Sequence, residues 1–152
     1  GTYGYQQYEI SNYAKPGYMC RHNAGYWQRR EYLGFGLGAS SLYRELRFSN
    51  TGRMQEYLTD SGKLEQIRKE VTVLSRNEQI EEFMFLGLRM TEGISEKLFK
   101  ETFGVRIMDI YGDILQKYEA IGFMEHIETK WCLTRKGIHV SNHILADFLL
   151  DE

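Results

Sequence analysis

One histidine lies in a setting that could bind a ligand. His22 is followed by Asn23 and then by two bulky aromatic residues, Tyr26 and Trp27. An imidazole can ligate haem iron axially while flat aromatic rings pack on a porphyrin. Turn residues surround this segment and predict a loop, from which His22 could reach a ligand. Residue chemistry alone leaves two interpretations open: a haem ligand, or an ordinary loop histidine held by hydrogen bonds.

A second pair of histidines has a spacing that metal sites use. His139 and His143 are four residues apart in a segment predicted to be helical, a separation found in metal-binding helices. No third ligand accompanies them, and they lie beside the apolar stripe of that segment. We therefore expect two exposed helix histidines and no metal site here.

Three glycines alternate with other residues in the segment 32–43. Gly34, Gly36 and Gly38 do not match the dinucleotide-binding pattern, because the third glycine comes one place early and no helix is predicted to follow. Alternate residues of a strand share one face, and glycine lets another group approach the backbone closely. We predict an extended segment that lines a pocket, beside Tyr8–Ser11 if the two segments pair.

The first half of the chain is typical of short strands and loops. A strand is expected over Gly4–Ile10 and a short helix over Arg53–Leu58. In the second half, apolar residues recur at helical spacing. They predict helices over 76–90, which we expect to be buried on nearly all sides, over 95–103 and over 107–121.

The predicted helices are followed by a hairpin and one more helix. Ser95 is placed to cap the second helix and Gly104 to end it. Residues 123–133 suggest a β-hairpin, and Thr134 could cap a last helix that carries Leu149 inward. Three helices, a hairpin and a helix are typical of a winged-helix domain. A compact interaction domain of another kind would give the same pattern.

Charge is divided unevenly along the chain. Residues 1–74 carry ten Lys and Arg against seven Asp and Glu, whereas residues 75–152 carry nine against fourteen. The helix over 107–121 occupies the place of a recognition helix, yet its exposed positions hold three acidic residues and one lysine. Such a surface would repel phosphate groups, so we expect no nucleic-acid partner.

The cysteines and the apolar runs also exclude some functions. Cys20 and Cys132 lie far apart in the sequence, whereas an iron–sulfur cluster needs closely spaced thiolates, so no cluster is expected in these residues. Sparse cysteine use favours a reducing, cytoplasmic location. No apolar run approaches the ~20 residues that cross a bilayer, so no transmembrane segment is expected.

A series of motifs, taken in order, resembles one family. The motifs are Tyr8-Glu9-Ile10-Ser11-Asn12-Tyr13-Ala14, Pro16-Gly17, Arg21-His22-Asn23, Tyr26-Trp27, Tyr32 to Ser41, Phe83 to Arg89, Thr91-Glu92-Gly93, Leu133 to Gly137 and Ser141-Asn142. They are similar to the oxygen-independent coproporphyrinogen III oxidase-like radical S-adenosylmethionine (SAM) proteins. Within these proteins, the closer branch is the one regarded as haem chaperones. The resemblance covers essentially the whole chain.

The resemblance implies a protein longer than these 152 residues. Its amino-terminal part would be a partial (β/α) barrel with a Cys-x-x-x-Cys-x-x-Cys motif that binds a [4Fe–4S] cluster and SAM. Residues 1–72 would form the end of that barrel and a linker layer, and residues 73–152 a winged-helix-like domain, which makes the chain α+β. The barrel would be the chief partner and haem-accepting proteins a further one.

This chain alone would then lack the family's chemistry, whether or not the longer protein turns over a substrate. The competing interpretation is a stand-alone winged-helix module that binds protein or nucleic acid.

The resemblance also implies a haem site. His22, Asn23, Tyr26 and Trp27 are similar to the pattern that marks the haem-chaperone branch, with His22 as the candidate iron ligand. The position before Arg21 is commonly serine in that branch, whereas here it is Cys20. The resemblance therefore leaves open whether Cys20 competes with His22 as ligand.

A second site is implied for SAM or a substrate. Its candidate residues come from the first predicted strand and from the glycine segment: Tyr8, Glu9, Ser11, Gly34, Gly36 and Gly38.

Overall fold

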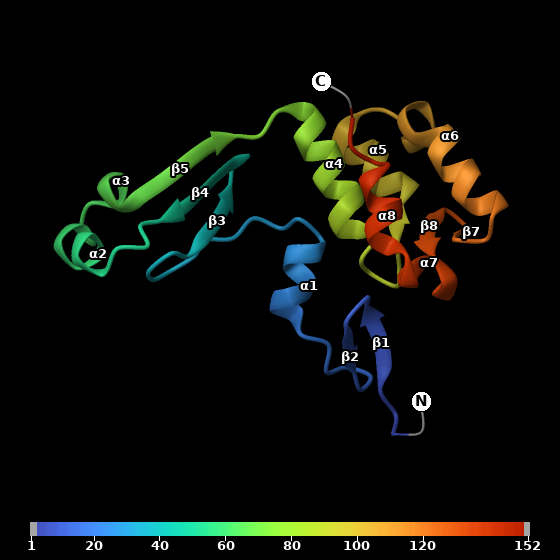
Figure 1. Ribbon diagram of the computed structural model, residues 1–152, viewed down its shortest axis with the longest axis horizontal. Helices are drawn as coiled ribbons and strands as arrows, with labels where there is room; N and C mark the ends of the chain where they lie inside the picture. Colours follow the sequence, from blue (N-terminus) through green and yellow to red (C-terminus); the bar gives the residue numbers. More distant parts are fainter. Residues whose placement is uncertain (1–2, 151–152) are drawn as a thin grey trace. The chain divides into compact units, whose positions relative to one another are not determined.

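Two stretches that are far apart in the sequence fold together in the computed structural model. Gly1–Arg29 and Ile80–Glu152 form one unit, and Arg30–Gln79 forms another. The structure describes residues 3–150. In that part of the chain it is a mixed α/β fold with three small sheets and eight helices, named in Figure 1.

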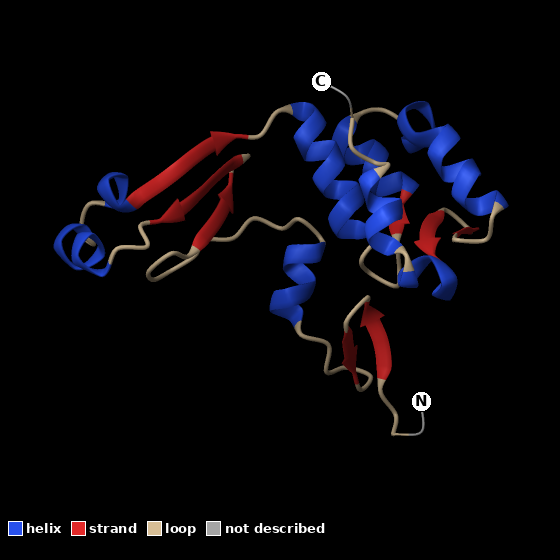
Figure 2. Cartoon of the chain, in the orientation of Figure 1, coloured by secondary structure: helices blue, strands red, loops and turns tan. Residues whose placement is uncertain are grey.

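The larger unit has a helical core. Its helices are α4 (Arg76–Gly87, which starts four residues before the unit does), α5 (Glu96–Phe103), α6 (Ile107–Ala120), α7 (Arg135–His139) and α8 (Ser141–Ala146). A hairpin of β7 (Met124–Ile127) and β8 (Lys130–Leu133) lies between α6 and α7, and the short strand β6 (Ile94–Ser95) pairs with β8. Figure 2 shows this order of helix and strand.

Large apolar side chains from α4, α5, α6, α8 and the β7–β8 hairpin meet in a single cluster. It includes Met84, Leu88, Phe99, Phe103, Ile107, Tyr111, Leu115, Tyr118, Trp131, Ile144 and Phe148. Tyr111 brings one polar group, its hydroxyl, into this cluster. The hydroxyl donates a hydrogen bond to the backbone carbonyl of Phe148 at 3.0 Å. A buried hydroxyl is tolerated because it has such a partner.

The predicted helix ends are confirmed. The Ser95 hydroxyl accepts a hydrogen bond from the backbone N–H of Leu98, and Gly104 ends α5 in the left-handed conformation with φ of 73°. Thr134 caps α7 by accepting from the N–H of Gly137. These side chains satisfy N–H groups that a helix start leaves without partners.

Two predictions for this unit are wrong. The first turn of α4 is exposed, and Phe85 further along it is 43% exposed, so the helix is not buried on nearly all sides. The expected last helix is broken at Val140, whose ψ of 19° with φ of −118° is not helical. Phe148 is buried as predicted, whereas Leu149, which was predicted to point inward, is 64% exposed.

The amino-terminal residues form a hairpin and a short helix. Strand β1 (Gln6–Glu9) pairs with β2 (Asn12–Ala14), so the expected strand over 4–10 is shorter than predicted. Residues 8–10 also run along the segment after α4: Ile10 N–H donates to the carbonyl of Arg89 at 3.0 Å, and Thr91 N–H to that of Tyr8 at 3.1 Å. Helix α1 (Arg21–Trp27) follows the hairpin.

The second unit is built on a sheet of order β3-β4-β5. The strands are β3 (Ser40–Tyr43), β4 (Leu46–Asn50) and β5 (Arg68–Val73), and between β4 and β5 lie α2 (Met54–Asp60) and α3 (Leu64–Ile67). The short helix predicted over 53–58 is thus confirmed.

The predicted extended segment over 32–43 is mostly wrong. Only Tyr32, which bridges Leu42, and strand β3 are extended. Gly36 and Gly38 have φ of 103° and 67°, values that suit a turn and that residues other than glycine rarely adopt. The pairing considered with Tyr8–Ser11 is replaced by pairing of β1 with β2 and of β3 with β4.

The core cluster yields a stability prediction. Leu115 on α6 is fully buried, so Leu115→Ala should lower the free energy of unfolding by about 2–5 kcal/mol through lost burial and a cavity. Urea unfolding followed by tryptophan fluorescence measures it, because both tryptophans, Trp27 and Trp131, lie in this unit. Leu98→Ala is the matched control, since Leu98 is 51% exposed. Equal effects of the two changes would contradict the placement of Leu115.

Candidate functional site

A fully buried carboxylate lies at the end of β1. Glu9 has no exposed surface. Its Oε2 accepts from the backbone N–H of Ser11 at 2.9 Å and from the Asn12 amide, and its Oε1 accepts from Arg89 Nε at 3.0 Å and from the Arg89 terminal nitrogen at 2.8 Å. A buried charge needs such complete pairing. Glu9 is therefore bound within the protein, by its own turn and by the chain after α4.

Arg89 joins this carboxylate to α1. Its guanidinium carbon lies 4.5 Å from the centre of the Trp27 ring, at cation–π distance. The indole N–H of Trp27 is buried and has no hydrogen-bond partner among the residues that the structure describes. Trp27 is thus held by packing and by the cation, and through Arg89 the hairpin and α1 are fixed to the same point.

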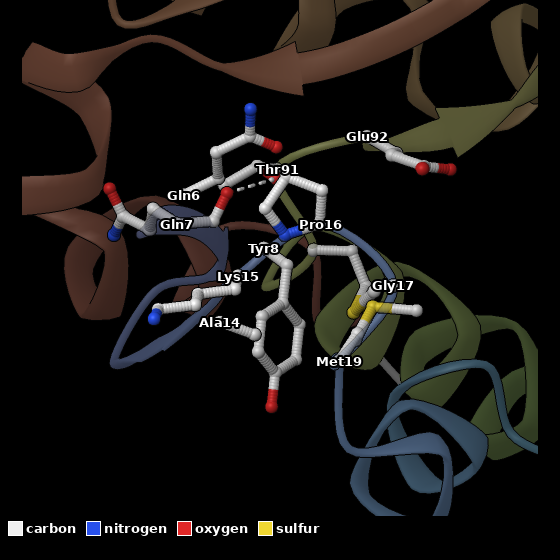
Figure 3. Close-up of a pocket in the computed structure, with 11 residues that line it drawn as sticks. Gln6, Gln7, Tyr8, Ala14, Lys15, Pro16, Gly17, Met19, Thr91 and Glu92 are labelled. Atoms are coloured by element: carbon white, nitrogen blue, oxygen red, sulfur yellow. Dashed lines mark hydrogen bonds between the residues drawn. The ribbon is translucent and has the colours of Figure 1, made fainter. Parts of the chain in front are cut away.

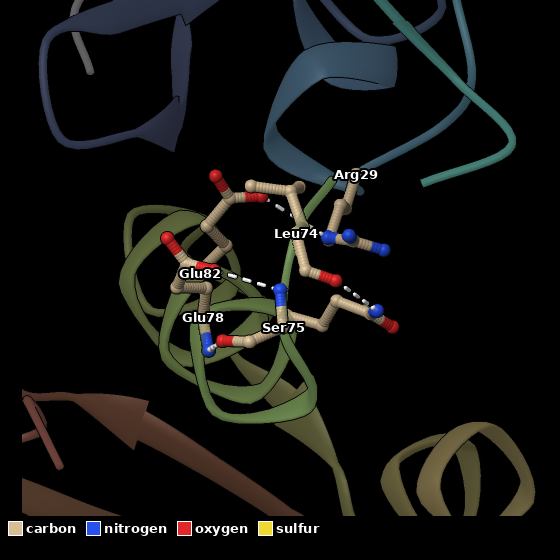
Figure 4. A network of polar contacts seen from close by, with 6 residues as sticks. Arg29, Leu74, Ser75, Glu78 and Glu82 are labelled. Atoms are coloured by element: carbon tan, nitrogen blue, oxygen red, sulfur yellow. Dashed lines mark hydrogen bonds and ion pairs between the residues drawn. The ribbon is translucent and has the colours of Figure 1, made fainter. Parts of the chain in front are cut away.

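A second ion pair fixes the end of α1 to α4. Arg29 Nε donates to Glu82 Oε2 at 3.2 Å, and the two side chains are 10% and 18% exposed. Figure 4 shows this contact. The same figure shows the start of α4, where Glu78 accepts from the N–H of Ser75 at 2.7 Å. That hydrogen bond lowers the pKa of Glu78.

The four candidate haem residues lie on α1, so the predicted loop around His22 is wrong. Asn23 and Gly25 are weak helix formers, but buried Ala24 and the Trp27–Arg89 contact favour the helix. The His22 ring is exposed and lies 4.7 Å from the Tyr26 ring, centre to centre and nearly perpendicular. The helix thus brings His22 and Tyr26 together and uses Trp27 as an anchor.

A cavity opens on one face of the β1–β2 hairpin. Its volume is about 350 Å³, and Tyr8, Lys15, Met19, Thr91 and Glu92 are among its lining residues. Figure 3 shows the Tyr8 ring and the Met19 side chain beside it. Tyr8 is the one candidate SAM or substrate residue that lines it, whereas Glu9 and Ser11 do not.

The three candidate glycines belong to the other unit. The physical constraint that favours glycine at Gly34 differs from the one at Gly36 and Gly38. A Cβ at Gly34 would lie 2.2 Å from the Ser40 carbonyl oxygen, so the close approach there is to its own sheet. Gly36 and Gly38 have open space around them and are needed for positive φ. The Asn50 amide holds this loop by donating to the carbonyls of Gly34 and Gly36 at 3.2 and 2.9 Å.

Cysteine and metal chemistry are limited in this part of the protein. Burial raises the pKa of the Cys132 thiol, which donates to the Glu92 carbonyl at 3.3 Å and so stays a neutral thiol. Cys20 is exposed. Over residues 3–150, no three His, Cys, Asp or Glu side chains lie together as a metal site would require. The two cysteines do not suit a [4Fe–4S] cluster.

Known proteins are similar to the chain along nearly its whole length. Residues 74–140 match the HemN C-terminal domain. The chain is 35% identical over 149 residues to the heme chaperone HemW of Lactococcus lactis and 35% over 148 residues to that of Bacillus subtilis. These matches cover 98% and 97% of this chain. Residues 74–140 thus form a HemN C-terminal domain, and the chain as a whole is homologous to these HemW proteins.

A solved structure agrees on the fold. The coproporphyrinogen III oxidase HemN of Escherichia coli, a radical SAM enzyme, matches with a TM-score of 0.72 at 16% identity, over 97% of this chain and 38% of that one. The chain spans 39% of the length of the two HemW relatives. The family predicted from the motifs is confirmed, and its HemN-like domain includes α4 to α7.

No helix in the part of this HemN-like chain that the structure describes has both the length and the apolarity to cross a membrane. Arg89 ends one of the family motifs, but its role as the partner of Glu9 could not be predicted from the sequence. Nothing in the spacing couples it to Glu9, which is 80 residues away. The only available signal was an acidic residue in an otherwise apolar, strand-forming stretch, since buried acids need a cation.

The buried pair yields a second prediction. Glu9→Gln should destabilise the larger unit by about 3 kcal/mol, because it removes the charge that pairs with Arg89 and leaves that guanidinium partly buried without it. Urea unfolding by tryptophan fluorescence again measures it. Glu101→Gln, which removes the partner of exposed Lys97, should change stability little. A Glu9→Gln variant as stable as this control would show that the pair contributes nothing.

The glycine loop yields a third prediction. Gly34→Ala should destabilise the β3-β4-β5 unit by about 1–3 kcal/mol, because the added Cβ meets backbone. Gly62→Ala in the same unit is the control, since nothing lies within 4 Å of its Cβ position. Amide hydrogen exchange in β3 to β5 reports on this unit alone. Unchanged exchange in Gly34→Ala would refute the close contact.

Proposed function

We propose that this chain is the carboxy-terminal part of a haem chaperone, in which His22 supplies an axial ligand to haem iron. The observation that carries the proposal is the arrangement of α1. Trp27 is anchored on Arg89, while His22 is exposed beside Tyr26. The names of the HemW relatives, to which the chain is 35% identical over nearly its full length, support the same function.

The residues present fit a haem. An exposed neutral imidazole has a nitrogen available for iron, and a nearby aromatic ring can pack against a porphyrin. The near-perpendicular contact with Tyr26 restrains the His22 ring without covering it. Asn23 is half-buried next to His22 and can steady the helix by a side-chain hydrogen bond.

Two contacts with other parts of the larger unit anchor α1. Arg89 packs on the ring of Trp27, and Arg29, two residues after the helix ends, pairs with Glu82 on α4. A helix of seven residues is unstable by itself, so these two contacts keep it in place. His22 is thereby presented from a fixed support, which lowers the entropy lost when a ligand binds.

Further parts of the proposal concern the longer protein. Residues 1–72 would form the end of a radical SAM barrel and a linker layer, whereas a [4Fe–4S] cluster and SAM would be bound by the barrel. Residues 73–152 would act as a winged-helix-like domain, which is supported by the order α4, β6, α5, α6, β7 and β8 and by the pairing of β6 with β8. We propose a cytoplasmic location and haem-accepting proteins as partners. The alternative of a stand-alone winged-helix module is not favoured.

The SAM or substrate site is proposed in a narrower form. Tyr8 is its best candidate because it lines the 350 Å³ cavity. Glu9 and Ser11 would contribute by shaping the turn, since the Ser11 N–H donates to the Glu9 carboxylate. Gly34, Gly36 and Gly38 stay candidates only through the family resemblance.

Haem titration tests the proposed function. The chain and the longer protein that contains it are titrated with haem, and the Soret band is followed for wild type, His22→Ala and Cys20→Ser. We expect His22→Ala alone to lose the ligated spectrum. His139→Ala is the control for a nonspecific effect, since His139 is also exposed and lies on α7.

The other outcomes are also informative. Loss of the spectrum in Cys20→Ser alone would make the exposed Cys20 the ligand and refute the role of His22. Unchanged spectra in both variants would place the haem elsewhere and leave His22 as an ordinary surface residue.

A further inference from the structure

The β1–β2 hairpin gathers tyrosines on one of its faces. Gln6 lies opposite Ala14 and Gln7 opposite Tyr13. Successive side chains of a strand point to opposite faces. This register puts Tyr13 on the face opposite Tyr8. Tyr5 and Lys15, next to the strand ends, line one hollow together with Tyr13, and Lys15 lies at the edge because it also lines the cavity beside Tyr8. Figure 3 agrees, since the Lys15 side chain extends away from the Tyr8 ring.

A tight turn adds a third tyrosine. The Tyr18 N–H donates to the Lys15 carbonyl at 2.9 Å across Pro16 and Gly17, and Gly17 has φ of 83°. Proline followed by a glycine with positive φ is the sequence of a type II turn. The turn fixes Tyr18 relative to Lys15, so the group of tyrosines is set by backbone geometry.

Together these side chains line a second hollow in the surface. Its volume is about 390 Å³, and its lining is Tyr5, Tyr13, Ala14, Lys15 and Tyr18. The three tyrosines are 51%, 59% and 81% exposed, so the hollow opens to solvent. The ammonium of Lys15 lies 5.7 Å from the centre of the Tyr5 ring. We call this surface the tyrosine face.

The chemistry of the tyrosine face selects a class of ligand. Exposed aromatic side chains gathered in a hollow are typical of binding sites, because rings offer large contact area at low entropic cost. The lining contains one cation and no carboxylate. A flat ring that carries a carboxylate therefore complements it in shape and in charge.

We propose that the tyrosine face binds one edge of a tetrapyrrole ring, with the tyrosines packed on the plane and Lys15 paired with a carboxylate side chain. The choice of a tetrapyrrole rests on the proposed haem function. Tyr18 and His22 are four residues apart in the sequence, so their Cα atoms are separated by at most about 14 Å. One large planar ligand can therefore contact both residues. Tyr18 would pack on the ring of this ligand, whereas His22 would ligate its iron.

Metal-free protoporphyrin IX separates the two, because it has no iron for His22 to ligate. The protein is titrated with it, and the porphyrin absorbance and fluorescence are followed. Tyr13→Leu with Tyr18→Leu should weaken binding about tenfold or more, and Lys15→Met should weaken it several-fold. The control Tyr43→Leu, which removes a tyrosine 39% exposed in the other unit, should leave it unchanged.

Two controls make the result specific. The dimethyl ester of the same porphyrin has no carboxylate, so Lys15→Met should not alter its binding. Urea unfolding of the tyrosine variants should match that of wild type, since the rings they remove are more than half exposed.

The outcomes distinguish the inference from the function on which it rests. If His22→Ala abolishes iron ligation while the tyrosine variants bind metal-free porphyrin as wild type does, the tyrosine face is refuted and the proposed function stands. If the tyrosine variants lose metal-free porphyrin while His22→Ala binds haem normally, the tyrosine face stands and the role of His22 fails. No binding of metal-free porphyrin by wild type would overturn the inference.

Discussion

The ion pair between Glu9 and Arg89 is the contact on which the larger unit depends. It joins a strand at the start of the chain to the segment that follows α4, and both of its ends are needed. Without Arg89, a fully buried carboxylate would lack its cation. Without Glu9, the Arg89 guanidinium, which packs on the Trp27 ring, would lose its position. Burial makes the pair sensitive, because a charge removed from water must be matched by one partner in good geometry.

The candidate haem helix follows from this arrangement. Helix α1 has no side-chain cap at its start and only seven residues, so its stability comes from the residues it packs against. Trp27 and Arg29 face those residues, and His22 faces solvent. The hairpin is held by backbone hydrogen bonds to residues 89–91. Both of its faces line hollows.

Local patterns predicted local structure well. Ser95, Gly104 and Thr134 marked helix ends correctly, because capping depends on a few neighbouring residues. The family motifs were also read correctly. The misses at α1 and at the glycine loop have one cause: contacts distant in sequence overrode local preference. Asn23 and Gly25 favour a turn, but Arg89 stabilises a helix there. The glycines suggested a strand, but Asn50 holds a loop.

The ion pair between Arg29 and Glu82 has a topological consequence. Residues 30–79 form a separate unit. Arg29, which directly precedes it, contacts Glu82, which lies three residues after it, and both belong to the larger unit. The second unit is therefore an insertion whose entry and exit points are already joined. The free energy of closing such a loop changes only slowly with its length. The stability of the larger unit therefore depends little on how many residues the insertion contains. A change in the length of the insertion would therefore cost the support beneath α1 little free energy.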